Sequence, residues 1–136
     1  MQTYSQKKSI LLVLSLVFID QLSKYIIRTS RGFYICNAGI SFGLKIPTAL
    51  FYPIWSIVFL SLIYLFFKKY SKYSYAILLI LAGSVSNLID RLYNGCVIDF
   101  IDWKIWPLFN LADVFICLGF FLLIVKIKST SPQPSP

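Results

Sequence analysis

Four long apolar segments dominate the hydrophobic pattern of the chain. They cover approximately residues 9–27, 48–67, 73–92 and 109–127, and shorter stretches with polar or charged residues separate them. Each segment is close to the roughly 20 residues that an α-helix needs to span the hydrocarbon core of a bilayer. The pattern therefore predicts an all-α membrane protein with four transmembrane helices.

Two of the connecting stretches differ in character from the helical segments. Residues 33–42 and 97–103 are rich in aromatic and β-branched side chains, and the dipeptide Asn94-Gly95 is a turn signal before the second stretch. They predict short extended segments at the membrane surface. Residues 129–136 are polar and rich in proline, which predicts a disordered tail after a single membrane domain over residues 1–128.

Composition agrees with a chain whose solvent is the bilayer. Hydrophobic residues make up 58% of the sequence and charged residues 13%, against roughly 45–50% and about 25% in soluble domains. The net charge of +8 does not indicate a nucleic-acid partner, because the Lys and Arg residues lie beside apolar runs rather than along one polar face. With no His and no Cys-x-x-Cys spacing, we expect no metal and no cofactor.

The three cysteines leave two interpretations open. Cys36 and Cys96 could form a disulfide if both face an oxidising compartment. Alternatively, these two and Cys117 are small apolar residues that fill space.

The basic residues predict the orientation of the chain. Cytoplasmic loops are enriched in Lys and Arg, and seven lysines lie at the same ends of the four segments. With an even number of spans, both termini are expected in the cytoplasm. The seven are Lys7, Lys8, Lys68, Lys69, Lys72, Lys126 and Lys128.

All acidic residues are aspartates, and they converge on the opposite, outer level of the membrane. They are Asp20, Asp90, Asp99, Asp102 and Asp113. A carboxylate at membrane depth is costly and indicates function by default. A structural role accounts for Asp20, which has Lys24 one helical turn later. It also accounts for Asp90, beside Arg91, and for Asp102 in a loop.

Asp99 and Asp113 are the predicted catalytic pair. Neither has a basic residue within four positions, and the absence of His excludes a Ser-His or Cys-His relay. Two close carboxylates share one proton, because both cannot ionise cheaply. The ionised one can activate water while the protonated one polarises a scissile carbonyl. Asn87 and Asn110 each lie three residues before an aspartate, where they can support the site.

Three stretches, together with Asp20 and Lys24, resemble the signatures of the lipoprotein signal peptidase family, also called signal peptidase II. The stretches are NAGISFG at 37–43, SNLIDRLYNGCVIDFID at 86–102 and FNLADVFICLG at 109–119. They look like the family's Asn-x-Gly-x-x-Phe, Asn-x-x-Asp-Arg with Val-x-Asp-Phe, and Phe-Asn-x-Ala-Asp elements. Their order and spacing cover nearly the whole chain. Ser86 stands where the family usually has Gly.

The resemblance implies an aspartic endopeptidase that cleaves signal peptides from lipid-modified prolipoproteins, just before the lipidated cysteine. The site is expected on the outer side of the bacterial cytoplasmic membrane, in a protein that contacts membrane lipids and acts as a monomer. Residues 33–46 and 97–103 would form a small extracytoplasmic β-cradle and a lid. Catalytic roles carry over to Asp99 and Asp113, and supporting roles carry over to Asp20, Asn37, Gly39, Asn87, Arg91 and Asn110.

Two alternatives belong to other classes of protein. A small non-catalytic transporter or channel would also place carboxylates inside a membrane, along a polar path. Such a path needs polar groups in the inner half of the bilayer, where stretches such as 11–18 and 122–127 are almost entirely apolar. The other alternative is a structural assembly factor without chemistry.

Overall fold

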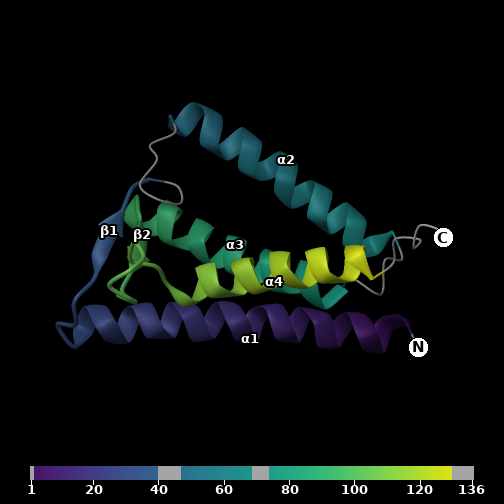
Figure 1. Ribbon diagram of the computed structural model, residues 1–136, viewed down its shortest axis with the longest axis horizontal. Coiled ribbons are helices and arrows are strands. Elements are labelled where there is room, and N and C mark those ends of the chain that lie inside the picture. The colour runs from purple at the N-terminus through teal and green to yellow at the C-terminus, as the bar shows by residue number, and fades with distance from the viewer. Residues whose placement is uncertain (1, 40–46, 69–73, 130–136) are drawn as a thin grey trace, which may run out of the picture.

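The computed structural model describes residues 2–39, 47–68 and 74–129 of the chain. Within them it is mainly helical. The elements are α1 (Gln2–Thr29), β1 (Ile35–Asn37), α2 (Thr48–Phe67), α3 (Ser74–Asn94), β2 (Val97–Asp99) and α4 (Leu111–Lys128). Helices α1, α3 and α4 lie side by side, whereas α2 leans away from them toward the end where the strands lie (Figure 1).

Among the described residues, three helical stretches are long and apolar enough to cross a membrane. They are Lys7–Thr29, Ala49–Phe67 and Ser74–Asn94. Helix α4 has 18 residues, fewer than any of these three stretches, and three of them are charged: Asp113, Lys126 and Lys128. A fourth span at α4 therefore stays a prediction.

Helix α4 begins two residues later than the apolar pattern suggested, because Asn110 is its N-cap. The Asn110 side chain accepts a hydrogen bond from the backbone N–H of Asp113, and the Asp113 side chain accepts one from the backbone N–H of Asn110. This reciprocal pair satisfies amide groups that have no partner inside the helix. It also fixes the Asp113 carboxylate at the first turn.

The core is centred on α3, which packs closely on α4 through glycines. A Cβ atom at Gly83 would lie 2.3 Å from the Ala112 carbonyl oxygen, and one at Gly119 would lie 2.7 Å from the Ala76 carbonyl oxygen. Side chains larger than hydrogen at these two positions would push the helices apart. The small-residue run 82–86 thus allows a close approach of α3 to α4, with Gly83 at the contact.

The two strands form a small antiparallel sheet at one end of the helices. Ile35 pairs with Asp99, Cys36 with Ile98 and Asn37 with Val97. A disulfide joins Cys36 to Cys96, which answers the question that the sequence left open. The sheet confirms extended structure within 33–39 and 97–103, while residues 40–46 of the expected lid lie outside the described residues.

The start of α1 and the end of α4 lie at the same end of the molecule, opposite the sheet (Figure 1). This arrangement puts both described ends of the chain on one side and the sheet on the other. The expected tail lies outside the described residues from 130 onward, and Ser129 still hydrogen-bonds to the last turn of α4.

Candidate active site

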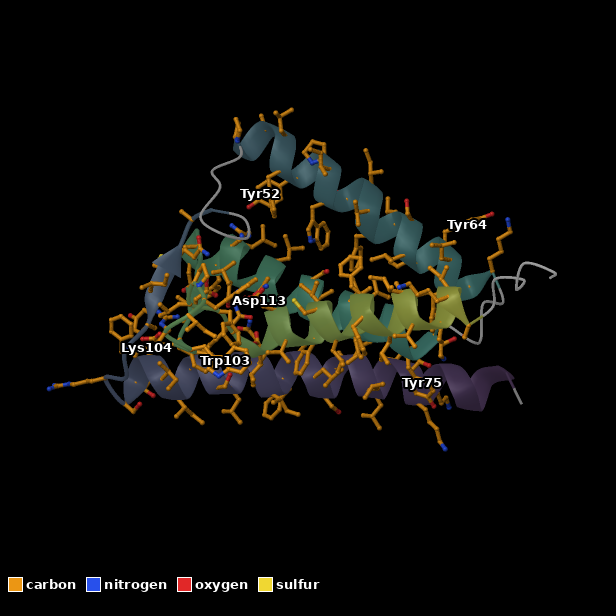
Figure 2. The ribbon with its side chains drawn as sticks, in the orientation of Figure 1. Tyr52, Tyr64, Tyr75, Trp103, Lys104 and Asp113 are labelled. Atoms are coloured by element: carbon orange, nitrogen blue, oxygen red, sulfur yellow. A yellow bond between two sulfur atoms is a disulfide. The ribbon has the colours of Figure 1, made fainter. Side chains whose placement is uncertain are left out.

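A cavity of about 460 Å³ lies between the sheet and helices α2, α3 and α4. Asp99 and Asp113 both line it, as do the predicted supporting residues Asn37, Gly39, Asn87 and Arg91. Its other walls are mostly apolar and include Phe51 and Trp55 from α2, which no motif in the sequence marked. Figure 2 shows Asp113 toward the end of the molecule that carries Trp103 and Lys104.

Asp99 occupies the last position of β2 and is 2% exposed. Asn37 donates to its Oδ2 at 2.9 Å, and Asn110 donates to its Oδ1 at 2.7 Å. Burial raises the pKa of the Asp99 carboxyl, because the charged form loses water, and the two amide donors oppose the rise. Strand pairing explains the contact with Asn37, since Asn37 pairs with Val97, two residues before Asp99, so the two side chains are diagonal neighbours on one face of the sheet.

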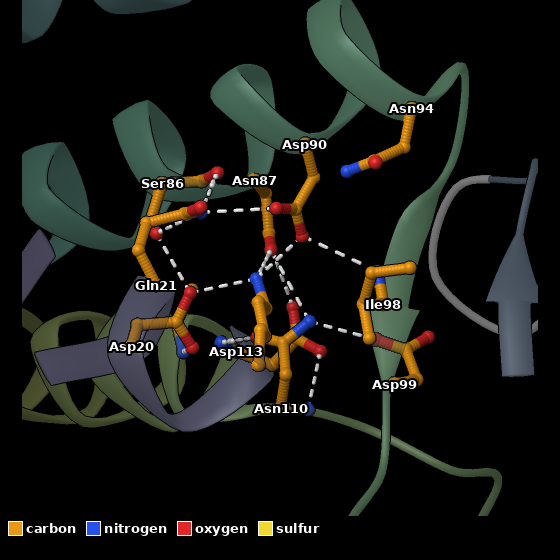
Figure 3. A network of polar contacts seen from close by, with 12 residues as sticks. Asp20, Gln21, Ser86, Asn87, Asp90, Asn94, Ile98, Asp99, Asn110 and Asp113 are labelled. Carbon is orange, nitrogen blue, oxygen red and sulfur yellow. Dashed lines mark hydrogen bonds and ion pairs between the residues drawn. The ribbon is translucent and has the colours of Figure 1, made fainter. Parts of the chain in front are cut away.

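Asp113 approaches the same region from the first turn of α4. Asn87 donates to its Oδ1 at 2.8 Å, and the backbone N–H of Asn110 donates to its Oδ2 at 3.2 Å. The Asn110 residue therefore contacts both carboxylates, through its side chain on one and its backbone on the other (Figure 3). All four carboxylate oxygens of the predicted pair accept a hydrogen bond.

A buried ionic cluster lies behind the two aspartates. Lys24 is 2% exposed and pairs with Asp20 at 2.6 Å and with Asp90 at 2.7 Å. The contact with Asp20 confirms the pair predicted from the sequence. The contact with Asp90 was missed, because Lys24 and Asp90 are on different helices.

Gln21 and Ser86 extend this cluster and were also missed. Gln21 donates to the Ser86 hydroxyl and to Asp90 Oδ1, and the Ser86 hydroxyl donates to Asp20 at 2.7 Å (Figure 3). In the sequence, the one signal for these contacts was Gln21, a glutamine inside an apolar segment. Polar side chains in membrane helices need partners. Ser86 stands where the resembled family usually has Gly, and its hydroxyl group takes part in the cluster.

Arg91 does not pair with the neighbouring Asp90, contrary to the structural role expected from their adjacency. It donates to the Gly39 carbonyl oxygen at 2.7 Å and lies over the Phe51 ring. Adjacent residues on a helix point in different directions, and only those three or four apart share a face. Arg91 therefore joins the end of α3 to the segment after β1 and to α2.

Asp102 lies outside this network, as expected for a loop carboxylate. It is bonded to Lys104, and that hydrogen bond lowers the pKa of the Asp102 carboxyl. Among residues 2–39, 47–68 and 74–129, every buried side-chain nitrogen or oxygen has a hydrogen-bond partner. In the same residues no three His, Cys, Asp or Glu side chains are grouped as ligands for a metal ion.

Comparison with known proteins shows which family the chain belongs to. The family model described as signal peptidase (SPase) II matches residues 12–128, which include every aspartate of the chain. The chain belongs to the signal peptidase II family. It is therefore an aspartic peptidase of bacterial membranes, and membership in the signal peptidase II family disfavours the transporter and assembly-factor alternatives.

Relatives of this signal peptidase II chain match along most of their length. It is 38% identical over 133 residues to the lipoprotein signal peptidase of Caldanaerobacter subterraneus subsp. tengcongensis, covering 85% of this chain and 92% of the relative. It is 34% identical over 146 residues to that of Staphylococcus aureus strain Newman, covering 90% of each.

Solved structures support the same fold. Two structures, each of a bacterial membrane enzyme, superpose with TM-scores of 0.83 and 0.81 at 28% and 31% sequence identity. The first covers 96% of this chain and 94% of the other, and the second covers 92% and 95%. The arrangement of helices and sheet is thus shared with known enzymes of bacterial membranes.

Proposed function

We propose that this signal peptidase cleaves lipid-modified prolipoproteins just before the lipidated cysteine, with Asp99 and Asp113 as the catalytic pair. One observation carries the proposal. A strand and a helix each bring one buried or half-buried carboxylate to a single cavity, and the Asn110 residue bonds to both carboxylates. Two carboxylates that share a proton are sufficient for peptide hydrolysis without a metal.

The proposed reaction uses the two carboxylates in opposite protonation states. The ionised carboxylate accepts a proton from water as the water oxygen forms a bond to the scissile carbonyl carbon. The protonated carboxylic acid donates to the carbonyl oxygen. Collapse of the tetrahedral intermediate breaks the C–N bond, and a proton passes to the leaving amine of the cysteine. The pair thereby returns to one shared proton.

The surrounding amides support this role by holding the carboxylates in place. Asn37, Asn87 and Asn110 each donate a side-chain N–H to one of the two acids. Asn37 is held in turn by the Gly39 backbone N–H, which donates to its side-chain oxygen. We assign Asp20 and Arg91 to the supporting structure as well, through the buried cluster and the bond to Gly39.

The cavity walls fit a substrate that carries both peptide and lipid. Phe51, Trp55 and Ile116 supply apolar surface next to the carboxylates. Burial of acyl chains against such surface is favourable, at about 0.8 kcal/mol for each CH₂ group. The large apolar side chains exposed along α1, α2 and α4 fit contact with membrane lipids, and we propose a monomer as the active form.

We propose four spans, with both termini in the cytoplasm and the site on the outer side of the inner membrane. The common end of the start of α1 and the end of α4 supports an even number of spans. The lysines at that end support its cytoplasmic location. The disulfide at the opposite end fits an oxidising outer compartment.

The test is cleavage of a purified precursor by the purified protein. A lipidated prolipoprotein and the same precursor with its cysteine replaced by serine, which carries no lipid, are incubated separately. We expect a new N-terminus at the lipidated cysteine, seen by mass spectrometry, and no cleavage of the serine precursor. Equal cleavage of both precursors, or of neither, would contradict the proposed function.

A further inference from the structure

The buried ammonium group of Lys24 uses all of its hydrogen-bonding capacity. It lies 2.6 Å from Asp20 Oδ2, 2.7 Å from Asp90 Oδ2 and 3.1 Å from Asn87 Oδ1. An ammonium has three N–H donors and no acceptor. The group that faces Lys24 from Asn87 must therefore be the amide oxygen.

This contact determines which end of the Asn87 amide faces Asp113. Lys24 and the Asn110 amide both donate to Asn87 Oδ1. With its oxygen held there, the NH₂ group of Asn87 is directed to Asp113 Oδ1, at 2.8 Å. A reversed amide would place an oxygen against the carboxylate and remove this donor.

The orientation of the Asn110 amide does not depend on Lys24, because a backbone group fixes it. The backbone N–H of Asp113 donates to Asn110 Oδ1 at 3.0 Å, so the NH₂ group of Asn110 is free to face Asp99 and Asn87. Of the two amides that join α3 and α4 to the carboxylates, only Asn87 takes its orientation entirely from other side chains.

We propose that Lys24 is a positioning residue for peptide hydrolysis, whose ammonium orients the Asn87 amide so that its N–H donates to Asp113. This inference rests on the proposed role of Asp113 as a reacting group. Lys24 does not line the cavity, so it acts through Asn87 and does not contact the substrate. Its effect belongs to the chemical step rather than to substrate binding.

The structure offers a way to remove Lys24 without changing the charge of the cluster. Asp20, Lys24 and Asp90 together carry a net charge of −1, and the double variant Lys24→Met with Asp90→Asn keeps only Asp20 and hence the same charge. Asp20 retains donors from the Ser86 hydroxyl and the Ala112 backbone. The amide oxygen introduced at position 90 can still accept from Gln21 or from the Ile98 backbone.

The experiment measures kcat, KM and thermal stability with the lipidated precursor for Lys24→Met, for the double variant and for two controls. Asp90→Asn alone keeps Lys24, and Arg28→Met removes an exposed cation one turn further along α1. We expect both Lys24 variants to lose at least about tenfold in kcat, the scale of one lost hydrogen bond to a charged group. KM should be unchanged in all four, Arg28→Met should keep the kcat of the unmodified protein, and Asp90→Asn, which keeps Lys24, should lose less kcat than the double variant.

Each other outcome overturns the inference. A folded double variant with full kcat would show that Lys24 has no positioning role. A rise in KM with constant kcat would place its effect in binding, and failure of both Lys24 variants to fold would make its role purely structural. Turnover by Asp113→Asn, with the Lys24 variants impaired, would instead refute the proposed catalytic pair.

Discussion

The environment of Asp99 leads to a prediction about how the activity depends on pH. Burial raises the pKa of its carboxyl, while the donors Asn37 and Asn110 favour the ionised form. A proton shared with Asp113 is therefore retained at pH values where an exposed aspartate has already ionised. We expect kcat/KM to follow a bell-shaped curve, low in acid when both acids are protonated and low again when the last proton leaves.

Asn37→Ala tests this explanation by removing one of the two amide donors. The pKa of Asp99 should rise further, so the descending limb of the curve should move to higher pH. The raised pKa of Asp99 also makes the free energy of unfolding depend on pH. A raised pKa means that the folded chain binds more protons than the unfolded chain above the ordinary aspartate value, so the free energy of unfolding falls as pH rises through this window. A descending limb of the kcat/KM curve that stays in place or moves to lower pH would contradict the role of Asn37 as a donor that lowers the pKa of Asp99.

Ser86 makes a second prediction at the scale of single residues. Its hydroxyl is fully buried, donates to Asp20 and accepts from Gln21. Ser86→Ala leaves both partners with one bond fewer, which should lower the free energy of unfolding by about 1–3 kcal/mol. Ser61→Ala is the control, since this exposed hydroxyl donates to the Ile57 carbonyl oxygen within α2, and thermal denaturation in detergent compares the two variants. Equal melting temperatures would contradict the role of the cluster in stability.

Sequence spacing could predict contacts within one helix but not those between helices. The Asp20–Lys24 pair follows from residues four apart sharing a helix face. The second partner of Lys24, Asp90, is on another helix, and its adjacency to Arg91 suggested a different pairing. Asp99 and Asp113 could be singled out because they lack basic neighbours, and their catalytic role stays a prediction. Their amide donors come from three separate elements, and spacing alone could not connect them.

The glycines between α3 and α4 carry a prediction at the scale of elements. A methyl group at Gly83 would meet the Ala112 backbone and the Ile116 side chain, and the backbone cannot yield without moving α4. Overpacking of this kind costs about 1–3 kcal/mol. Since α4 also carries Asp113, we expect Gly83→Ala to lower both melting temperature and kcat.

Gly95→Ala is the matched comparison for this substitution. Gly95 has a φ of +73°, and a Cβ there would meet nothing within 4 Å. The left-handed conformation costs a non-glycine residue about 1–2 kcal/mol, so stability should fall while kcat is retained. If Gly83→Ala also kept full kcat, the close contact of α3 and α4 would not be needed to position Asp113.

The lengths of the apolar segments predicted the helices well. The aromatic and β-branched stretches predicted the sheet only in part. The range 48–67 agrees with α2, while α1 begins at Gln2 because a helix can continue beyond its membrane-spanning stretch. The extended character of 33–39 and 97–103 could be inferred from aromatic and β-branched residues. Their pairing with each other could not, because the register depends on contacts between distant parts of the chain.

At the scale of the whole molecule, the sheet and the site lie at one end, and the start of α1 and the end of α4 lie at the other (Figure 1). The positions of the lysines predict that the chain ends are cytoplasmic. A reporter that is active only in the cytoplasm should be active when fused after Lys128 and silent after Lys104. An active fusion after Lys104 would overturn the proposed orientation and the outer location of the site.

The measurement that tests the central claim most directly is turnover of a lipidated precursor by Asp99→Asn, Asp113→Asn and the double variant. Asparagine is nearly isosteric with aspartate, so abundance should survive. Each single variant should lose the acid–base contribution, on the order of 10²–10⁴-fold or more. The double variant should be no worse than either, because residues that act as a unit are not additive. Asp102→Asn, which changes an exposed carboxylate, should keep full activity. Substantial turnover by either single variant would contradict the account.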